Sequence, residues 1–160
     1  MPRHNQRLRG QLTEPEGSSQ SRGRLALDPS PLGGERRAAT LPDDARVVKT
    51  IGDEVMVVGQ DVAALVDWAV GFVRLFEERP EPRIGIHWGS ALYRDGDYYG
   101  REINLASRVV ARARGGEVLV SDSVVDAVSG APHLEFEEIG QVKLKGFDDP
   151  RQLCRVSLRE

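Results

Sequence analysis

The pattern of hydrophobic and polar positions changes sharply near residue 46. Residues 1–45 are rich in Arg, Gly, Ser and Pro, with neither helical nor alternating apolar spacing. Such a segment buries too little apolar surface to offset the entropy lost on ordering, so we predict a disordered, low-complexity tail. Residues 46–158 carry regular apolar repeats and are predicted to form one folded domain.

The folded part opens with a predicted β-hairpin. Two β-rich runs, 47–51 and 55–58, flank a Gly-Asp-Glu turn. Asp61 is then a suitable N-cap for a helix whose apolar residues recur at helical spacing as far as Phe76, before an Arg-Pro pair stops the pattern. This helix has one apolar face, and we expect it to lie on a sheet.

The remainder alternates between strands and helices. We predict a strand over 83–89, a helix over 100–114, a strand over 117–121 and a short helix over 122–128. Two further strands lie between Leu134 and Val156, around a Lys-Gly-Phe turn. Hairpins mixed with helices are typical of a layered α+β sandwich.

Composition and charge exclude several classes of protein. No apolar run approaches the roughly 18 residues that a membrane span needs, and the N-terminus lacks the apolar core of a secretory signal, so a cytoplasmic protein is expected. The formal net charge of -3 gives no general attraction to nucleic acid. A single cysteine, Cys154, cannot form an internal disulfide and is expected to be a small core residue.

Four motifs, in order, resemble the catalytic domain of class III nucleotide cyclases of the adenylate cyclase type. They are VVKTIGDE at 47–54, RIGIHWG at 83–89, GDYYGREINLASR at 96–108 and VKLKGF at 142–147. The resemblance implies a ferredoxin-like sandwich that converts ATP to cyclic AMP and pyrophosphate in intracellular signalling, with Mg²⁺ or Mn²⁺ as cofactor.

The resemblance also assigns roles to single residues. Asp53 corresponds to one of two aspartates that hold the metal ions, and a carboxylate is a suitable ligand for a hard cation. Lys49 and Asp97 match the pair that reads adenine, in which the ammonium donates to a ring nitrogen and the carboxylate accepts from the exocyclic amine. A turn aspartate and an ordinary strand lysine are the structural alternatives for Asp53 and Lys49.

The predicted second helix carries two more of these residues. Asn104 and Arg108 are one turn apart and share a helix face, and the family uses them to orient the ribose and to stabilise charge on the transferring phosphate. Arg83 and Lys145 resemble contacts to the terminal phosphate, although surface charges at strand ends would explain them almost as well. His87 is expected to be a core or supporting residue.

One expected part of the family's domain is missing from the sequence. The family begins with a strand of the pattern Phe-x-Asp-(hydrophobic)-x-Gly-Phe-Thr, which supplies the first metal aspartate, and two helices follow it. Neither Asp43 nor Asp44 replaces this aspartate, because nine extended residues place them roughly 30 Å from Asp53. The sequence therefore predicts an N-terminally truncated domain with one metal carboxylate unsupplied.

Three functional hypotheses follow. The first is an adenylate cyclase, impaired alone, that binds ATP and works as a homodimer or as a heterodimer with another cyclase domain. The second is a non-catalytic partner or degenerate remnant that binds nucleotide or a cyclase subunit. The third is a plain α+β binding domain. A second metal carboxylate separates the first hypothesis from the second, and ATP binding separates the second from the third.

Overall fold

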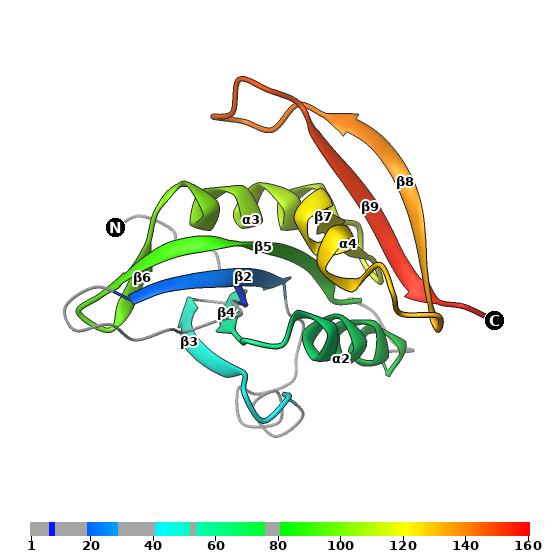
Figure 1. Ribbon diagram of the computed structural model, residues 1–160, viewed down its shortest axis with the longest axis horizontal. Coiled ribbons are helices and arrows are strands. Elements are labelled where there is room, and N and C mark those ends of the chain that lie inside the picture. Colours follow the sequence, from blue (N-terminus) through cyan, green and yellow to red (C-terminus); the bar gives the residue numbers. More distant parts are fainter. Residues whose placement is uncertain (1–6, 9–18, 29–40, 52–53, 76–80) are drawn as a thin grey trace.

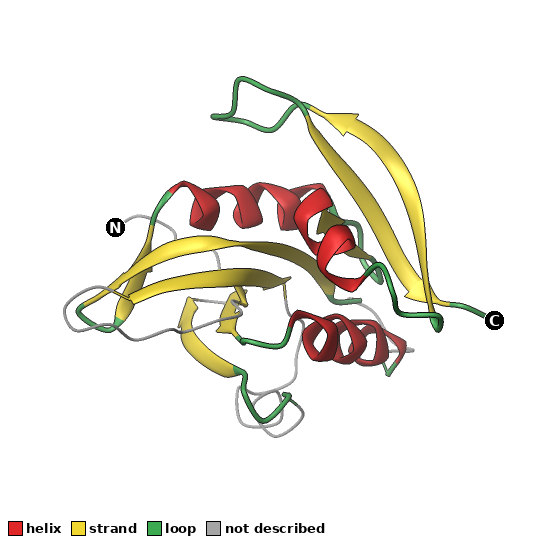
Figure 2. Ribbon diagram, viewed as in Figure 1, coloured by secondary structure: helices red, strands yellow, loops and turns green. Residues whose placement is uncertain are grey.

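The computed structural model describes residues 7–8, 19–28, 41–51, 54–75 and 81–160. Within these residues, nine strands form one β-sheet and three helices cover it on both faces (Figures 1 and 2). The strands are β1 (Arg7–Leu8), β2 (Ser19–Asp28), β3 (Arg46–Ile51), β4 (Glu54–Val58), β5 (Arg83–Arg94), β6 (Asp97–Tyr99), β7 (Val118–Ser121), β8 (Leu134–Val142) and β9 (Arg151–Leu158). The helices are α2 (Val62–Arg74), α3 (Arg101–Arg112) and α4 (Asp122–Val128).

The strand order is that expected for the predicted α+β class. The sheet runs β3-β4-β2-β5-β7-β9-β8, with β1 on β2 and β6 on β5. β2 lies antiparallel to both β4 and β5, so these two strands run in the same direction and are joined through α2. A β-α-β unit with another strand between its two strands is the feature of the ferredoxin-like arrangement, which confirms this part of the prediction.

β1 and β2 come from the segment that the sequence predicts to be a disordered tail. The pairs Leu25 with Val57 and Leu27 with Val55 join β2 to β4, and β2 also pairs with β5 as far as Asp28 with Arg83. The place expected to lack a strand is therefore filled. The backbone groups of β4 and β5 need partners there, and a strand with few apolar residues can supply them. The rest of residues 1–40 lies outside the described residues.

Alternation along the strands sorts side chains into two layers. On β4, Val55 and Val57 are buried with apolar residues of α2 and α4, whereas Met56 and Val58 are buried on the opposite face, toward α3. On β9, Cys154 is 4% exposed and packs in the layer under α2 and α4, as expected for a small core residue. Burial raises the pKa of its thiol, and the Glu138 carboxylate adds to this shift. Period-two alternation thus produces a helix–sheet–helix sandwich.

α3 lies unusually close to β5. A Cβ atom on Gly85 would lie 2.4 Å from the backbone nitrogen of Val110, so only glycine permits this approach. Farther along the same face, the segment between β8 and β9 folds over α3 and buries Leu144 and Phe147 against Leu105. α3 is therefore enclosed between the sheet below and this segment above (Figure 1).

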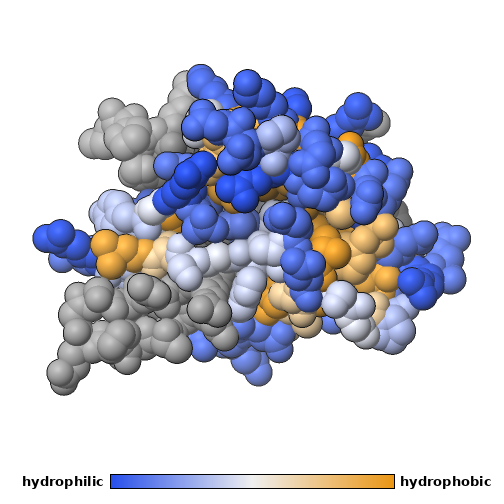
Figure 3. Space-filling model, turned by 45° about the horizontal axis from the view of Figure 1, so that its top comes forward, coloured by the Kyte–Doolittle hydropathy of each residue, from blue (hydrophilic) through white to orange (hydrophobic). Residues whose placement is uncertain are grey.

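The face of the described residues that is drawn in Figure 3 is mainly polar. Figure 3 shows one face on which hydrophilic side chains predominate and hydrophobic surface is exposed only in limited areas. Of the helices in the described part of the chain, none combines the length and the apolar character needed to cross a membrane.

Candidate active site

The structure brings Lys49 and Asp97 together although 48 residues separate them. Lys49 Nζ donates to Asp97 Oδ2 at 2.5 Å, and the two side chains are 22% and 24% exposed. Lys49 lies on β3 and Asp97 opens β6, at the far end of β5. In the sheet, β4 and β2 lie between β3 and β5. Adjacent strands are rotated by about 20–25° relative to each other, so β3 crosses the direction of β5 and passes near its end. The predicted base-reading residues are thus neighbours in space.

A small cluster supports this pair from below. Tyr98 is 2% exposed, and its backbone N–H donates to Asp97 Oδ1 at 2.7 Å. Its hydroxyl accepts a hydrogen bond of 2.8 Å from Arg46 Nη2 on β3. Tyr98 packs with Met56, Val58 and, on α3, Ile103. These contacts attach β6 to both β3 and α3, which limits the freedom of the Asp97 carboxylate.

α3 presents Asn104 and Arg108 one turn apart, as predicted. The helix begins after Gly100, whose φ of 133° is open to glycine and strained for other residues. Asn104 is exposed, and Arg108 is half-buried. The Nε of Arg108 is buried and has no hydrogen-bond partner among the described residues. A buried donor without a partner is costly, and Arg151 Nε, outside the predicted site, is in the same state.

Lys145 lies at the tip of the turn that covers α3. The Phe147 N–H donates to Leu144 O at 3.0 Å, and both of these side chains are buried, so the turn is fixed at its two ends while Lys145 stays exposed between them. Arg101, at the start of α3, has its guanidinium carbon 5.0 Å from the centroid of the Phe147 ring. Positive charge therefore collects around the first turns of α3.

Arg83 lies at the other end of β5, away from these residues. β5 is twelve residues long, so Arg83 and the β6 end are separated by roughly 35 Å along the strand, which is longer than one ATP molecule. Arg83 on β5 pairs with Asp28 on β2. The preceding residue of β2, Leu27, pairs with Val55 near the start of β4. Asp53, the predicted metal ligand, is outside the described residues. Among the described site residues, Arg83 thus lies far from Asp97 along β5.

The predicted metal site depends on Asp53 and stays a prediction. Among the described residues, no cluster of three or more His, Cys, Asp or Glu side chains could hold a metal ion. β2 pairs with β4 as far as Leu27 with Val55 and ends one residue later, at Asp28. A carboxylate is a suitable ligand for a hard cation. The sequence analysis did not single out Asp28, which directly follows the apolar run Leu25–Leu27.

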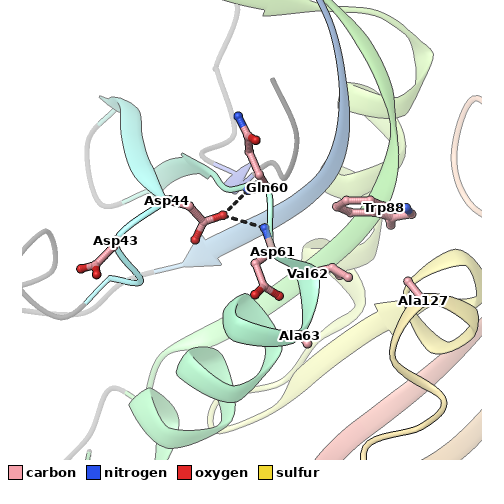
Figure 4. A pocket seen from close by; sticks show the side chains of 8 residues that line it. All are labelled: Asp43, Asp44, Gln60, Asp61, Val62, Ala63, Trp88 and Ala127. Carbon is pink, nitrogen blue, oxygen red and sulfur yellow. Dashed lines mark hydrogen bonds between the residues drawn. The ribbon is translucent and has the colours of Figure 1, made fainter. Parts of the chain in front are cut away.

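Asp44 has a different role from the one considered in the sequence. Its Oδ2 accepts hydrogen bonds from the backbone N–H groups of Gln60, at 2.5 Å, and of Asp61, at 2.6 Å, before α2 (Figure 4). Asp61 in turn caps α2 by accepting from Ala64 N at 3.0 Å, as predicted. A pocket of about 660 Å³ opens here, between these acids and Trp88 (Figure 4). It contains none of the predicted site residues.

His87 is a supporting residue, as expected, and it contacts α3 directly. Its ring is 3% exposed, and its Nε2 lies 2.5 Å from Glu102 Oε2. The sequence analysis did not single out Glu102. A glutamate in the first turn of a helix is common because it offsets the helix dipole, so the sequence carries no signal that a buried histidine would bind this one.

Known proteins resemble this chain in both sequence and fold. The family model for the adenylate and guanylate cyclase catalytic domain matches residues 37–156. The pH-sensitive adenylate cyclase of Mycobacterium tuberculosis (strain CDC 1551 / Oshkosh) is 36% identical over 153 residues, which are 92% of this chain and 36% of that protein. An adenylate cyclase of Streptomyces coelicolor is 37% identical over 84 residues, 51% of this chain and 22% of that protein. The chain thus spans about a third or less of these relatives.

Two solved structures share the fold. The adenylate/guanylate cyclase/hydrolase from Silicibacter pomeroyi superposes with a TM-score of 0.71 at 20% identity, over 88% of this chain and 99% of that chain. The adenylyl cyclase CyaB from P. aeruginosa gives 0.69 at 21% identity, over 90% and 97%. With a family model that matches three quarters of the sequence, this chain belongs to the adenylate and guanylate cyclase catalytic domain family.

Proposed function

We propose that this domain takes part in the conversion of ATP to cyclic AMP and pyrophosphate in the cytoplasm. The observation that carries the proposal is the contact between Lys49 and Asp97, two residues predicted from sequence to read adenine. The Lys49 ammonium can donate to a ring nitrogen of adenine, and the neighbouring Asp97 carboxylate can accept from its exocyclic amine. Held together before the base arrives, they lose little side-chain freedom on binding. The names of the adenylate cyclase relatives agree with this base.

α3 supplies the groups that act on the sugar and phosphate. In the proposed reaction the ribose 3′-oxygen forms a bond to the α-phosphorus, the bond from that phosphorus to the bridging oxygen breaks, and pyrophosphate leaves. Asn104 orients the ribose, and Arg108 stabilises the negative charge that develops on the phosphate. A permanently charged, planar guanidinium that is half-buried on the same helix as Asn104 supports this role. Lys145, on the turn above α3, binds the departing phosphates.

Other residues hold the metal end of the substrate. We assign Asp28 and Asp53 to Mg²⁺ or Mn²⁺, because Asp28 ends β2, which pairs with β4, and Asp53 directly precedes β4 in the sequence. A bound ion would polarise the phosphate and favour ionisation of the 3′-hydroxyl. Arg83 is at the same strand end and binds the terminal phosphate.

The proposed site is shared by two domains. Arg83, assigned to the terminal phosphate, and Asp97, assigned to adenine, lie at opposite ends of β5, farther apart than one ATP molecule is long, so a single chain cannot bring both to one substrate. Two domains that face each other in opposite directions would join the metal end of one to the base-reading end of the other. The partner is a second copy of this chain or another cyclase domain.

A complementation assay tests the proposal. This chain is mixed with a cyclase domain that keeps both metal aspartates but has alanine in place of its own transition-state asparagine and arginine, and cyclic AMP is measured. We expect activity in the mixture and a loss of about a hundredfold or more with Arg108→Ala. Arg112→Ala is the matched control, since Arg112 is an exposed arginine on the same helix. Activity that survives Arg108→Ala would refute the proposal.

The second candidate is a partner that binds nucleotide without turnover. The observation in its favour is that β2 lacks the sequence pattern of the family's first strand, which normally carries a metal aspartate. The same assay separates the two functions. ATP binding to the mixture, without cyclic AMP from any combination that includes this chain, would favour the non-catalytic partner.

A further inference from the structure

His87 lies at the centre of a hydrogen-bond chain that links four elements. On one side, Nε2 is 2.5 Å from the Glu102 carboxylate in the first turn of α3. On the other side, Nδ1 is 2.7 Å from Ser121 Oγ at the end of β7. Ser121 Oγ is 3.0 Å from Ser123 Oγ of α4, and Ser123 donates to the backbone oxygen of Trp88 at 2.7 Å. The ring is 3% exposed, so bulk water does not compete for these bonds.

The hydrogen bonds of this chain bear on which ring nitrogens of His87 carry hydrogen. The Trp88 oxygen can only accept, so the Ser123 hydroxyl hydrogen is used there. The contact between the two serine oxygens then takes its hydrogen from Ser121. Ser121 must therefore accept at its own oxygen, and the hydrogen on that bond comes from His87 Nδ1. With Glu102 ionised, its carboxylate also accepts, and both ring nitrogens then carry hydrogen.

Gly89 provides the space for the link to α3. A Cβ atom at this position would lie 2.2 Å from Glu102 Oε2 and 2.8 Å from His87 Nε2. Any side chain there would displace the carboxylate, which is at the end of a flexible side chain, and would crowd the buried His87 ring. Gly89 on β5 thus leaves the space in which the His87 ring, also on β5, contacts the Glu102 carboxylate on α3.

The start of α3 depends on this contact. The N-cap residue Gly100 makes no side-chain hydrogen bond to the helix, so the usual cap is absent at this end. Glu102 is two residues before Asn104 and six before Arg108. A tie between Glu102 and the buried ring thus fixes the segment of the helix that presents both residues.

We propose that His87 is a positioning residue of the cyclase site: its doubly protonated ring, held from behind by Ser121, binds Glu102 and sets the first turn of α3. This inference rests on the proposed function. The charged residues on the elements around the ring include Glu102 on α3, Asp122 at the start of α4 and, by backbone register, Arg24 on β2. Glu102 is in direct contact with the ring.

The test compares two variants that break the link with one that breaks a similar link elsewhere. Glu102→Gln keeps the shape but removes the charge, and Gly89→Ala pushes the carboxylate and the ring nitrogen apart. His133→Gln is the matched control, because His133 Nε2 is 2.7 Å from Asp67 in a pair whose side chains are 52% and 47% exposed, away from α3. Each full-length variant is assayed with the complementing cyclase domain, and ring nitrogens are followed by ¹⁵N NMR.

In the wild-type chain we expect both His87 nitrogens to give protonated ¹⁵N signals at pH 7.5. Both link variants should lower kcat about tenfold or more with little change in KM for ATP, since the adenine-reading pair is untouched. They should also speed amide hydrogen exchange in residues 101–105, whereas His133→Gln should behave as wild type.

A neutral His87 ring, or folded link variants with unchanged kcat and unchanged exchange, would overturn the inference. These results differ from failure of the proposed function. If no mixture makes cyclic AMP, the cyclase proposal is wrong, and the ring signals and α3 exchange still decide whether His87 holds the helix.

Discussion

Gly85 allows α3 to pack directly on β5, and its replacement by alanine gives a quantitative prediction. The added Cβ would lie 2.4 Å from Val110 N and 2.6 Å from Val110 Cα, both backbone atoms of the helix. An ordinary contact begins at 3.4 Å, so α3 must withdraw by about 1 Å. Overpacking of a core by one carbon typically costs about 1–3 kcal/mol, and a gap of this size also weakens the neighbouring dispersion contacts.

We therefore expect Gly85→Ala to lower the free energy of unfolding by about 2 kcal/mol. For a domain of this size such a change corresponds to a fall in Tm of roughly 5–10 °C. Urea unfolding, followed by circular dichroism, measures the free energy, and a thermal scan measures Tm. The catalytic effect should be larger than the stability effect suggests, because the displaced helix carries Asn104 and Arg108.

Gly71 is the matched control for this substitution. It lies within α2, it is exposed, and a Cβ there would meet nothing within 4 Å. Gly71→Ala should raise the free energy of unfolding by about 0.5–1 kcal/mol, because alanine is the better helix former. The two substitutions add the same methyl group and should act with opposite signs. Gly85→Ala with wild-type stability, or equal shifts for both variants, would contradict the close packing of α3 on β5.

Three other predictions concern the base, the metal and acid stability. ATP should bind more tightly than GTP in a competition assay, and the double substitution Lys49→Glu and Asp97→Cys should reverse this preference; equal binding of both nucleotides by the wild type would contradict the assigned pair. Asp28→Asn should weaken Mn²⁺ binding measured by electron paramagnetic resonance, whereas Asp61→Asn, which keeps a good N-cap, should not; equal effects would argue against Asp28 as a ligand. Burial alone would raise the pKa of Glu117, but hydrogen bonds from the Arg114 backbone and the Arg155 side chain lower it below its usual value of 4.5. A lowered pKa in the folded state stabilises the protein above about pH 4.5, and this contribution is lost as the pH falls through the folded pKa. Urea unfolding between pH 6 and 3 should therefore show a flatter pH dependence for Glu117→Gln, and parallel curves for wild type and variant would refute this reasoning.

The sequence by itself determined the local elements and the family. The hairpin at 46–58, the helix capped by Asp61 and the helix that carries Asn104 and Arg108 were all predicted close to their observed bounds. Short-range signals suffice for these features, since helical spacing, alternation and capping depend on residues a few positions apart. The motifs of the cyclase family are contiguous as well, which is why they could be recognised without a structure.

Only the tertiary structure decided how distant segments meet. Lys49 and Asp97 are neighbours because the sheet twists over three strand steps, and no local pattern contains that rotation. The pairing of Ser19–Asp28 between β4 and β5 was missed because its composition is that of a loop, while its place depends on the unpaired backbone groups of two other strands. The bond between His87 and Glu102 likewise exists only because Gly89 leaves room for it when α3 lies on β5. Contacts of this kind depend on how separate elements pack against each other, and the local sequence of one element contains no information about that packing.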